Sequence, residues 1–484
     1  MKSGTTFISD QFYAKHVSDL HFRHLRMAKA STSIQDCAAQ MAKEQVSCLF
    51  VGESPQQIQG YVTDITLRDQ ALAKGLAFDT PISEIMEHAM VSIHPEATLV
   101  EALLLMFRTK SRYLLVKENE QYIGWISRTK ILTEQSQGPF MFIQSVKEAR
   151  QITELKDKWQ RMPEIIHLLL SRGMKAGIVN QIITTVADTI TQRVIERVIK
   201  EIGSPPAKFV FFVLGSEGRG ELTLKTDQDN AIIYEDKANE QREAVRAYFL
   251  DFATRVSTAL DQIGIAFCDG ELMAMNPKWT HSLSHWKRNY ESWISDASQE
   301  TAMNYSTFFD CRAIFGEESL LVELKDYMGE LLEKAPERFF INLGYNALQY
   351  EPPLTFFRNI KTEKIDGEKQ LNLKQTMRPI VDLARVFALK HKIHETNTVR
   401  RIDLLRQKGV FTMPETQELI HAFNYLMSLR LENQAALILE KKEKPKNFLT
   451  LDSLTKVQSV TLIEIFKVIK DFQARIKFSF TRSL

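Results

Sequence analysis

The chain has 484 residues, a length that favours about three domains, and its 44% hydrophobic and 25% charged residues are typical of a globular protein. A formal net charge of +2 argues against an extended nucleic-acid surface. The four cysteines show no CxxC spacing, which favours reduced, mostly buried thiols over a disulfide framework. Because no apolar run reaches the length of a membrane span and residues 1–24 lack a signal-peptide core, we expect a cytoplasmic protein without membrane association.

An internal repeat occupies the first third of the chain, after an N-terminal tail at residues 1–19. Residues 33–51 align with residues 98–116, and each copy combines an amphipathic helical pattern with a short β-like run. A glycine-led strand follows each copy, at residues 60–63 and 124–127. The pattern predicts two similar α/β units.

Residues 20–136 thereby resemble a tandem CBS pair, or Bateman module. The resemblance implies a regulatory module that binds an adenine nucleotide and forms a homodimer. Thr63 and Ser127 could contact a ligand, but Thr66 and Lys130 stand where such modules usually place a ribose-binding aspartate. Lys130 could favour an added phosphate or another anion, or it could simply be a surface lysine. A dimerisation scaffold without a ligand is therefore the alternative for this module.

A helical linker is expected over residues 137–203. Its last helix carries an apolar residue at every fourth position, which predicts a buried stripe. The stripe consists of Ile182, Val186, Ile190, Val194 and Val198. The Gly-Ser-Pro-Pro sequence at residues 203–206 should end this helix before the next domain begins.

Two short motifs carry the chemistry of the next domain. A turn at Gly215 and Ser216 follows an apolar run, and Asp227 and Asp229 directly precede a second apolar run at residues 231–234. Residues two apart on a strand point to the same face, so this spacing predicts paired carboxylates. Carboxylates suit Mg²⁺, and the amides of a glycine turn suit phosphate. The pattern predicts a site for a metal ion and a triphosphate.

The Gly-Ser-Glu-Gly-Arg-Gly-Glu and Thr-Asp-Gln-Asp-Asn-Ala sequences within residues 215–231 resemble the signature of the nucleotidyltransferase superfamily that includes DNA polymerase β. They are similar to bacterial PII-protein uridylyltransferases, and closer still to a family of nucleotidyltransferases with paired CBS domains. The resemblance implies a polymerase β-like catalytic domain over residues 204–338. It also implies Mg²⁺ or Mn²⁺ on Asp227 and Asp229, with NTP phosphates at Gly215 and Ser216.

The role of Arg219 has two interpretations. Its guanidinium could neutralise the departing pyrophosphate, or it could form an internal salt bridge to Glu221 that fixes the loop. We assign both residues to the nucleotide-binding set.

The third catalytic carboxylate is less clearly marked. Asp269 follows an expected strand at residues 263–267, and the surrounding Cys-x-Gly and Met-Ala-x-Asn-Pro-x-Trp wording resembles a second signature of the CBS-linked family. Asp310 belongs to a sequence that resembles an Asp-x-Arg motif of the same family, and we expect it in a helix or loop. It could instead form a structural ion pair with Arg312. Both aspartates remain candidates.

A helical domain is expected over residues 339–484, and its sequence resembles that of the C-terminal domain of the same family. In related transferases such a domain closes over the nucleotide. Lys374, Arg378 and Arg385 could line the cleft toward the triphosphate, although such residues on a helix are usually solvated.

The overall prediction is a multidomain α/β (α+β) protein with a tandem CBS pair, a polymerase β-like domain and an all-α C-terminal domain. The resemblance implies an Mg²⁺-dependent transferase that moves an NMP from an NTP to a hydroxyl, as in PII uridylylation. A protein acceptor and an adenine nucleotide at the CBS pair are the implied partners. The alternative is a non-catalytic, nucleotide-sensing scaffold that retains the transferase fold.

Overall fold

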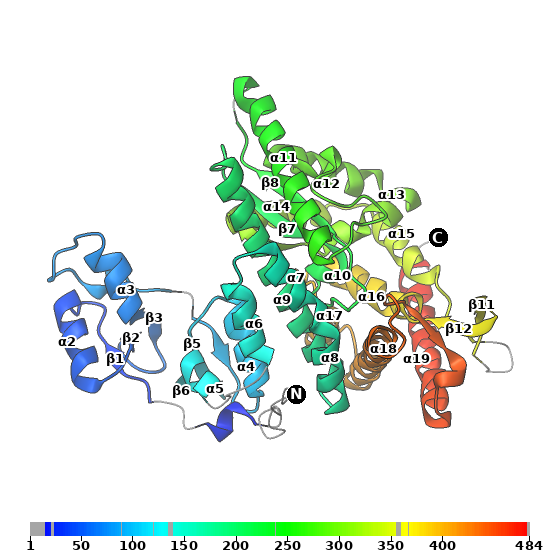
Figure 1. The fold of residues 1–484 in the computed structure, drawn as a ribbon, viewed down its shortest axis with the longest axis horizontal. Coiled ribbons are helices and arrows are strands. Elements are labelled where there is room, and N and C mark those ends of the chain that lie inside the picture. The colour runs from blue at the N-terminus through cyan, green and yellow to red at the C-terminus, as the bar shows by residue number, and fades with distance from the viewer. Residues whose placement is uncertain are drawn as a thin grey trace. The chain divides into compact units, whose positions relative to one another are not determined.

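The computed structural model describes residues 15–20, 24–88, 90–119, 121–133, 139–237, 239–354, 360–365 and 367–481 (Figure 1). The chain divides into two compact units, residues 1–142 and residues 143–484. Among the described residues, every helix is too short or too polar to cross a lipid bilayer. The predicted multidomain combination of α/β and helical parts is confirmed.

The first unit contains two three-stranded sheets of the same design. Each sheet pairs its first two strands in parallel and its last two antiparallel. The strand orders are β1 (Met27–Ala28), β2 (Cys48–Gly52), β3 (Ile58–Thr63) and β4 (Ser92–Ile93), β5 (Tyr113–Glu118), β6 (Gln121–Ser127). The helices are α2 (Ile34–Glu44), α3 (Asp64–Thr66), α4 (Leu99–Arg108) and α5 (Arg128–Thr133).

The repeat seen in the sequence extends to its helix caps and its core. Ser33 and Thr98 each accept a hydrogen bond from the amide three residues later and so begin α2 and α4 at equivalent positions. Side chains from both sheets form one apolar cluster, in which Phe50 meets Trp125 edge to face at 6.1 Å.

The second unit is built around a four-stranded sheet with the order β10-β7-β8-β9. β7 pairs antiparallel with both β10 and β8, whereas β8 and β9 are parallel. The strand bounds are β7 (Phe209–Val213), β8 (Asn230–Tyr234), β9 (Thr280–Ser282) and β10 (Arg312–Gly316). The helices of this part are α6 (Pro139–Glu148), α7 (Ile152–Gln160), α8 (Met162–Ser171), α9 (Ala176–Ile202), α10 (Gly215–Gly218), α11 (Asn239–Ile263), α12 (Leu283–Asp296), α13 (Gln299–Tyr305) and α14 (Glu318–Glu333).

Aromatic residues of β7 hold helices on both faces of the sheet, because successive strand residues point to opposite faces. Phe209 packs against Phe249 and Phe252 of α11, with ring centroids 5.1 and 5.5 Å away. Phe212 packs against Trp286 of α12 at 5.4 Å. All five residues of β7 and all five of β8 are buried, so the two strands form a rigid base for the loops at their ends.

Helix α9 confirms the predicted apolar stripe. All five stripe residues are buried, and the helix ends at Ile202 with Gly203 as its C-cap at φ +95°. One prediction of secondary structure is wrong. The expected strand at residues 263–267 is reduced to one bridge between Ala266 and Asp227, because α11 continues to Ile263. Asp310 lies in a short bend before β10, within the expected helix or loop.

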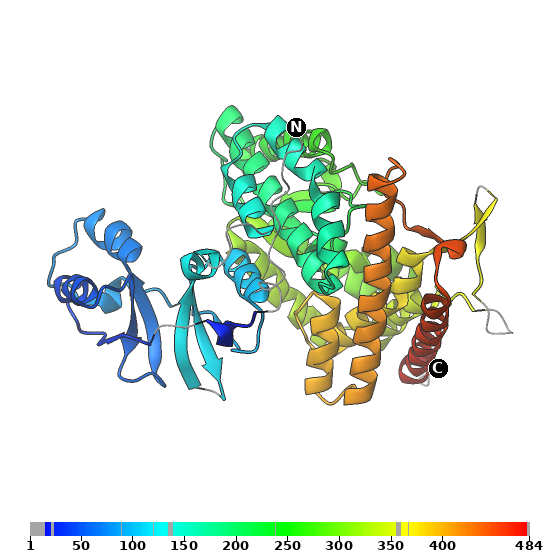
Figure 2. The same cartoon turned by 60° about the horizontal axis from the view of Figure 1, so that its bottom comes forward.

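In the residues that the structure describes, helices make up most of the C-terminal part of the second unit (Figure 2). They are α15 (Glu337–Leu348), α16 (Leu373–Lys390), α17 (Thr398–Gln407), α18 (Met413–Leu439) and α19 (Lys456–Thr481). A small antiparallel sheet, absent from the sequence prediction, joins them through β11 (Glu363–Ile365), β12 (Glu368–Asn372) and β13 (Phe448–Thr450). The predicted solvated loop at residues 440–446 is confirmed as a largely exposed segment without helix or strand.

Candidate functional site

The two aspartates lie directly before β8 and face the same way. Between them, Gln228 turns to the opposite side, where its amide donates hydrogen bonds to the carbonyls of Ser257 and Ile265, both at 2.9 Å. Because the side chain of Gln228 points into the core, the side chains of Asp227 and Asp229 on either side of it point together away from the core. The pair therefore forms as predicted, although at the entrance to the strand rather than within it.

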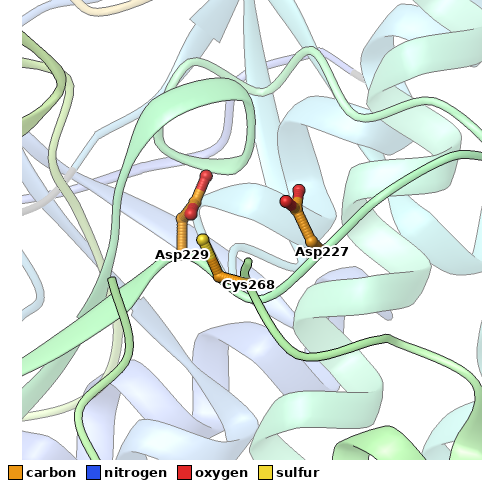
Figure 3. A group of neighbouring side chains, drawn as sticks. All are labelled: Asp227, Asp229 and Cys268. Atoms are coloured by element: carbon orange, nitrogen blue, oxygen red, sulfur yellow. The ribbon is translucent and has the colours of Figure 1, made fainter. Parts of the chain in front are cut away.

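Cys268 is the third member of this group, and sequence analysis did not identify it as a site residue. The bridge from Asp227 to Ala266 brings the loop after α11 alongside the pair. One ligand atom each from Asp227, Asp229 and Cys268 lies within 4.8 Å of the others, and Figure 3 shows the three side chains side by side. The Cys-x-Gly motif was the signal in the sequence that could have identified Cys268, but the prediction selected the neighbouring Asp269 instead.

The thiol acts as a hydrogen-bond partner of the carboxylate. Burial, followed by the charge of Asp229, raises the pKa of Cys268 to about 11, so the group is neutral at pH 7. Burial, followed by the charge of Asp227, raises the pKa of Asp229 to about 6, while a hydrogen bond with Cys268 lowers it. A neutral thiol beside two carboxylates stabilises the charged form of the nearer one.

The Gly-Ser turn lies against Asp229. The amide of Leu214 donates to the Asp229 carbonyl at 2.9 Å, and Gly215 adopts φ +56°. A Cβ atom at Gly215 would lie 3.1 Å from Asp229 Oδ2, so the close approach of turn and carboxylate favours glycine. Helical hydrogen bonding in α10 begins at the amide of Gly218, which leaves the first amides of this turn, including that of Ser216, available to an anion.

The donor set fits a magnesium ion held together with a phosphate. Mg²⁺ binds oxygen ligands and commonly uses one or two carboxylates plus substrate phosphate oxygens. Asp227 and Asp229 supply the carboxylates, and the turn beside them is a suitable place for the phosphate. The neutral thiol of Cys268 is a poor ligand for so hard a cation and instead supports Asp229.

Asp310 does not belong to this group. Its side chain is 0% exposed and forms ion pairs with Arg219 at 2.7 Å, Arg385 at 2.5 Å and Arg401 at 2.6 Å. Burial opposes ionisation, but the three arginines outweigh it and hold the pKa of Asp310 well below its usual range. The expected alternative, a pair with Arg312, is wrong.

The actual partner of Arg312 is Asp188, at 2.8 Å. Asp269 lies in an exposed turn outside the metal-competent group. Within the described part of the chain, that group therefore lacks a third carboxylate.

Arg219 and Glu221 form the internal salt bridge that was the second interpretation of Arg219. Arg219 Nε donates to Glu221 at 2.7 Å, and Glu221 is buried. The same carboxylate accepts the amide of Thr398 at 2.7 Å, at the first residue of α17. Anions are favoured at a helix N-terminus, so Glu221 joins the catalytic segment to the helical domain.

The three basic residues of α16 have different surroundings. Lys374 lies near the pair: burial lowers its pKa, whereas Asp227 and Asp229 act in the opposite direction. Arg378 instead stacks on the ring of Tyr350 and pairs with Asp382 at 3.3 Å. Arg385 is turned to Asp310. Of the three candidates, Lys374 is the one that the structure brings to the paired aspartates.

Glu217 is a second residue near the pair that the sequence did not reveal. It is buried in α10, and burial, followed by the charge of Asp188, raises its pKa to about 8, with Asp229 and Asp227 adding to the effect. Arg312 opposes this shift. Glu217 is therefore largely protonated at neutral pH.

Residues at the expected ligand positions of the CBS pair form hydrogen bonds with other residues of the protein. Thr63 and Thr66 share a hydrogen bond of 2.8 Å, and Thr66 donates to Glu87 at 2.6 Å. In the second copy, Ser127 accepts the amide of Lys130 at 3.2 Å and so caps the following helix. Thr63 likewise accepts the amide of Thr66 at 3.0 Å, so Thr63 and Ser127 both cap the turn that follows their strand.

Comparisons with known proteins cover both units. Residues 82–136 match the model described as "CBS domain", residues 160–300 match "Putative nucleotidyltransferase DUF294", and residues 337–480 match "Putative nucleotidyltransferase substrate binding domain". The two nucleotidyltransferase matches contain the paired aspartates and the helices from α15 onward, respectively.

Curated relatives match a single part of the chain. CBS domain-containing protein CBSCBSPB5 of Arabidopsis thaliana is 31% identical over 116 residues, which are 23% of this chain and 21% of the relative. CBSCBSPB2 of the same plant is 29% identical over 116 residues, which are 23% of this chain and 22% of the relative. The chain thus spans about a fifth of the length of these relatives.

Solved structures with likeness to this chain include CBS proteins. An uncharacterized conserved protein from Pyrococcus horikoshii is 21% identical with a TM-score of 0.24, covering 25% of this chain and 92% of its own. A CBS domain protein from Pyrobaculum aerophilum complexed with AMP is 22% identical with a TM-score of 0.23, covering 25% and 97%. The family matches alone identify the chain as a member of the family described as "Putative nucleotidyltransferase DUF294" that also contains a CBS domain.

Proposed function

We propose that this protein transfers a nucleoside monophosphate from an NTP to a hydroxyl group at the site formed by Asp227 and Asp229. The observation that carries the proposal is the contact between the aspartate pair and the Gly215 turn. The contact supports the proposal because two carboxylates that could hold a metal ion lie beside amides that could hold a phosphate. The family matches support the same reaction class.

Each residue of the site would have a separate role in the transfer. Asp227 and Asp229 would hold Mg²⁺ or Mn²⁺, which when bound supplies charge stabilisation at the attacking and departing oxygens. The amides at Gly215 and Ser216 would orient the β- or γ-phosphate. Lys374 would neutralise charge that develops on the pyrophosphate as it leaves.

The acceptor that we propose is a hydroxyl of a signalling protein, as in the uridylyltransferases that the motif resembles. The CBS pair would adjust the activity through a bound adenine nucleotide. Because Thr66 donates to Glu87 at the expected ligand position, a ligand there would have to displace this hydrogen bond.

A non-catalytic nucleotide sensor is the second candidate, and one observation favours it. In the described residues, Cys268 occupies the third position of the metal-competent group, where a carboxylate would serve as a base for the acceptor hydroxyl. Such a sensor would bind Mg²⁺–NTP and leave it intact.

Label transfer separates the two candidates. The purified protein would be incubated with each α-labelled NTP, Mg²⁺ or Mn²⁺ and lysate of its host, beside an Asp227→Asn/Asp229→Asn variant. The proposal predicts a labelled band with the native protein and none with the variant. Binding of Mg²⁺–NTP without label from any of the four nucleotides would contradict transfer and support the sensor.

A further inference from the structure

A buried arginine, Arg430, lies on α18. Its side chain is 8% exposed, and its Nε donates to Asn447 Oδ1 at 2.9 Å. By contrast, the buried Arg385 and Arg401 each form an ion pair with Asp310. Among the described residues, none of the ion pairs includes Arg430. Burial, followed by the charge of Arg219, lowers the pKa of Arg430 to about 10, although Asp227 and Glu221 oppose this effect. A bound anion would therefore stabilise the charged guanidinium.

A hydrogen-bonded chain fixes Arg430 beside the candidate site. Asn447 Oδ1 accepts from both Arg430 and Gln434, the latter at 3.2 Å. Gln434 in turn accepts the amide of Lys225 at 3.2 Å, two residues before Asp227. These contacts hold α18 against the segment that leads into the aspartate pair.

The same asparagine connects Arg430 to the start of α16. The carbonyl of Asn447 accepts the amide of Leu373 at 2.9 Å, and Lys374 is the next residue. Arg430 and Lys225 both lower the pKa of Lys374, after the larger effect of burial, so each of these two cations lies close enough to Lys374 to repel it. Asp227 and Asp229 attract the same lysine.

We propose that Arg430, with Lys374 and Lys225, forms a polyphosphate subsite that selects nucleoside triphosphates over shorter phosphates. The inference rests on the proposed function, because the reacting phosphate would lie at the aspartate pair. A triphosphate is longer and carries more negative charge than a monophosphate, so it would gain more from cations beside the aspartate pair. The guanidinium can hold two phosphate oxygens at once.

Calorimetry with inorganic tripolyphosphate and orthophosphate, each with Mg²⁺, tests this subsite. We expect the full-length protein to bind tripolyphosphate and Arg430→Met to weaken that binding about tenfold to hundredfold, since hydrogen bonds between charged groups are the strongest of their kind. Arg430→Lys keeps the positive charge but lacks the planar guanidinium that can hold two oxygens, so it should lose less tripolyphosphate affinity than Arg430→Met. Arg406→Met is the matched control, because Arg406 pairs with Asp403 on its own helix.

The outcomes distinguish this inference from the function on which it rests. No tripolyphosphate binding by the native protein, or equal affinity in native protein, Arg430→Met and Arg430→Lys, would overturn the subsite. If Arg430→Met does not fold, the comparison of Arg430→Lys with native protein decides. Arg430-dependent tripolyphosphate binding without transfer from any NTP would support the subsite and contradict transfer alone.

Discussion

Replacing Asp310 by asparagine tests whether this residue organises the fold or the chemistry. Asp310 Oδ2 accepts from Arg219 and Arg385, while Oδ1 accepts from Arg401 and Arg385. Asparagine has one oxygen and one NH₂ group, so either orientation points a donor at an arginine donor. The variant also removes the one charge that Arg219, Arg385 and Arg401 share.

The expected loss follows from burial. Removing one partner of a buried ion pair costs about 3–5 kcal/mol, because it leaves a charge without compensation. Two features of the site limit relaxation: Asp310 is 0% exposed, and Arg401 is 1% exposed. We therefore expect Asp310→Asn to lower the free energy of unfolding by at least about 3 kcal/mol. At neutral pH the stabilising charge is fully present, because the pKa of Asp310 lies far below 7.

Urea unfolding followed by tryptophan fluorescence measures this loss, since Trp159, Trp279, Trp286 and Trp293 all lie in the second unit. Asp403→Asn is the matched control. Its carboxylate pairs with Arg406 at 2.9 Å, but its side chain is 44% exposed, and exposed pairs contribute about 0–1 kcal/mol.

Two results would refute this reasoning. The first is a loss in Asp310→Asn no larger than that of the Asp403→Asn control. The second is an unchanged stability with loss of Mg²⁺–NTP affinity, which would assign Asp310 to metal binding, as the sequence had allowed.

Three further predictions concern the turn and its neighbours. Gly218→Ala should destabilise the second unit by more than about 2 kcal/mol, because the new Cβ would lie 1.8 Å from the carbonyl oxygen of Asp310; a thermal melt like that of native protein would contradict this. Glu217→Gln should gain stability relative to native protein as the pH rises from about 5 to 8, by up to about 1.4 kcal/mol per pH unit, because the raised pKa of Glu217 favours its protonated form. Equal pH profiles of Tm for variant and native protein would exclude that role. Cys268→Ser should keep Mg²⁺–NTP affinity within about threefold by calorimetry, since a hydroxyl can also donate to Asp229, whereas a much larger loss would show that the sulfur binds the metal.

The sequence predicted the features that depend on local pattern. The repeat of the first unit, the buried stripe of α9 and the family resemblance are confirmed, because each is written in consecutive residues or regular spacing. The paired aspartates are local in the same sense, since Gln228 needs only to turn into the core to align them.

Features that depend on distant residues were not predictable. Asp310 meets arginines from three segments, and nothing near it in sequence indicates Arg385 or Arg401. Cys268 reaches Asp229 through a single bridge, where we expected a full strand that would favour Asp269. The expected strand therefore pointed to Asp269, whereas the structure brings Cys268 to the pair.

The central claim is that the α-phosphate of an NTP is transferred at Asp227 and Asp229. Parallel reactions with α-labelled and γ-labelled forms of the same NTP test it most directly, with native protein and the Asp227→Asn/Asp229→Asn variant. The account predicts an acceptor labelled from the α position alone and only by the native protein. Label arriving from the γ position, or α-label transferred equally by the variant, would contradict it.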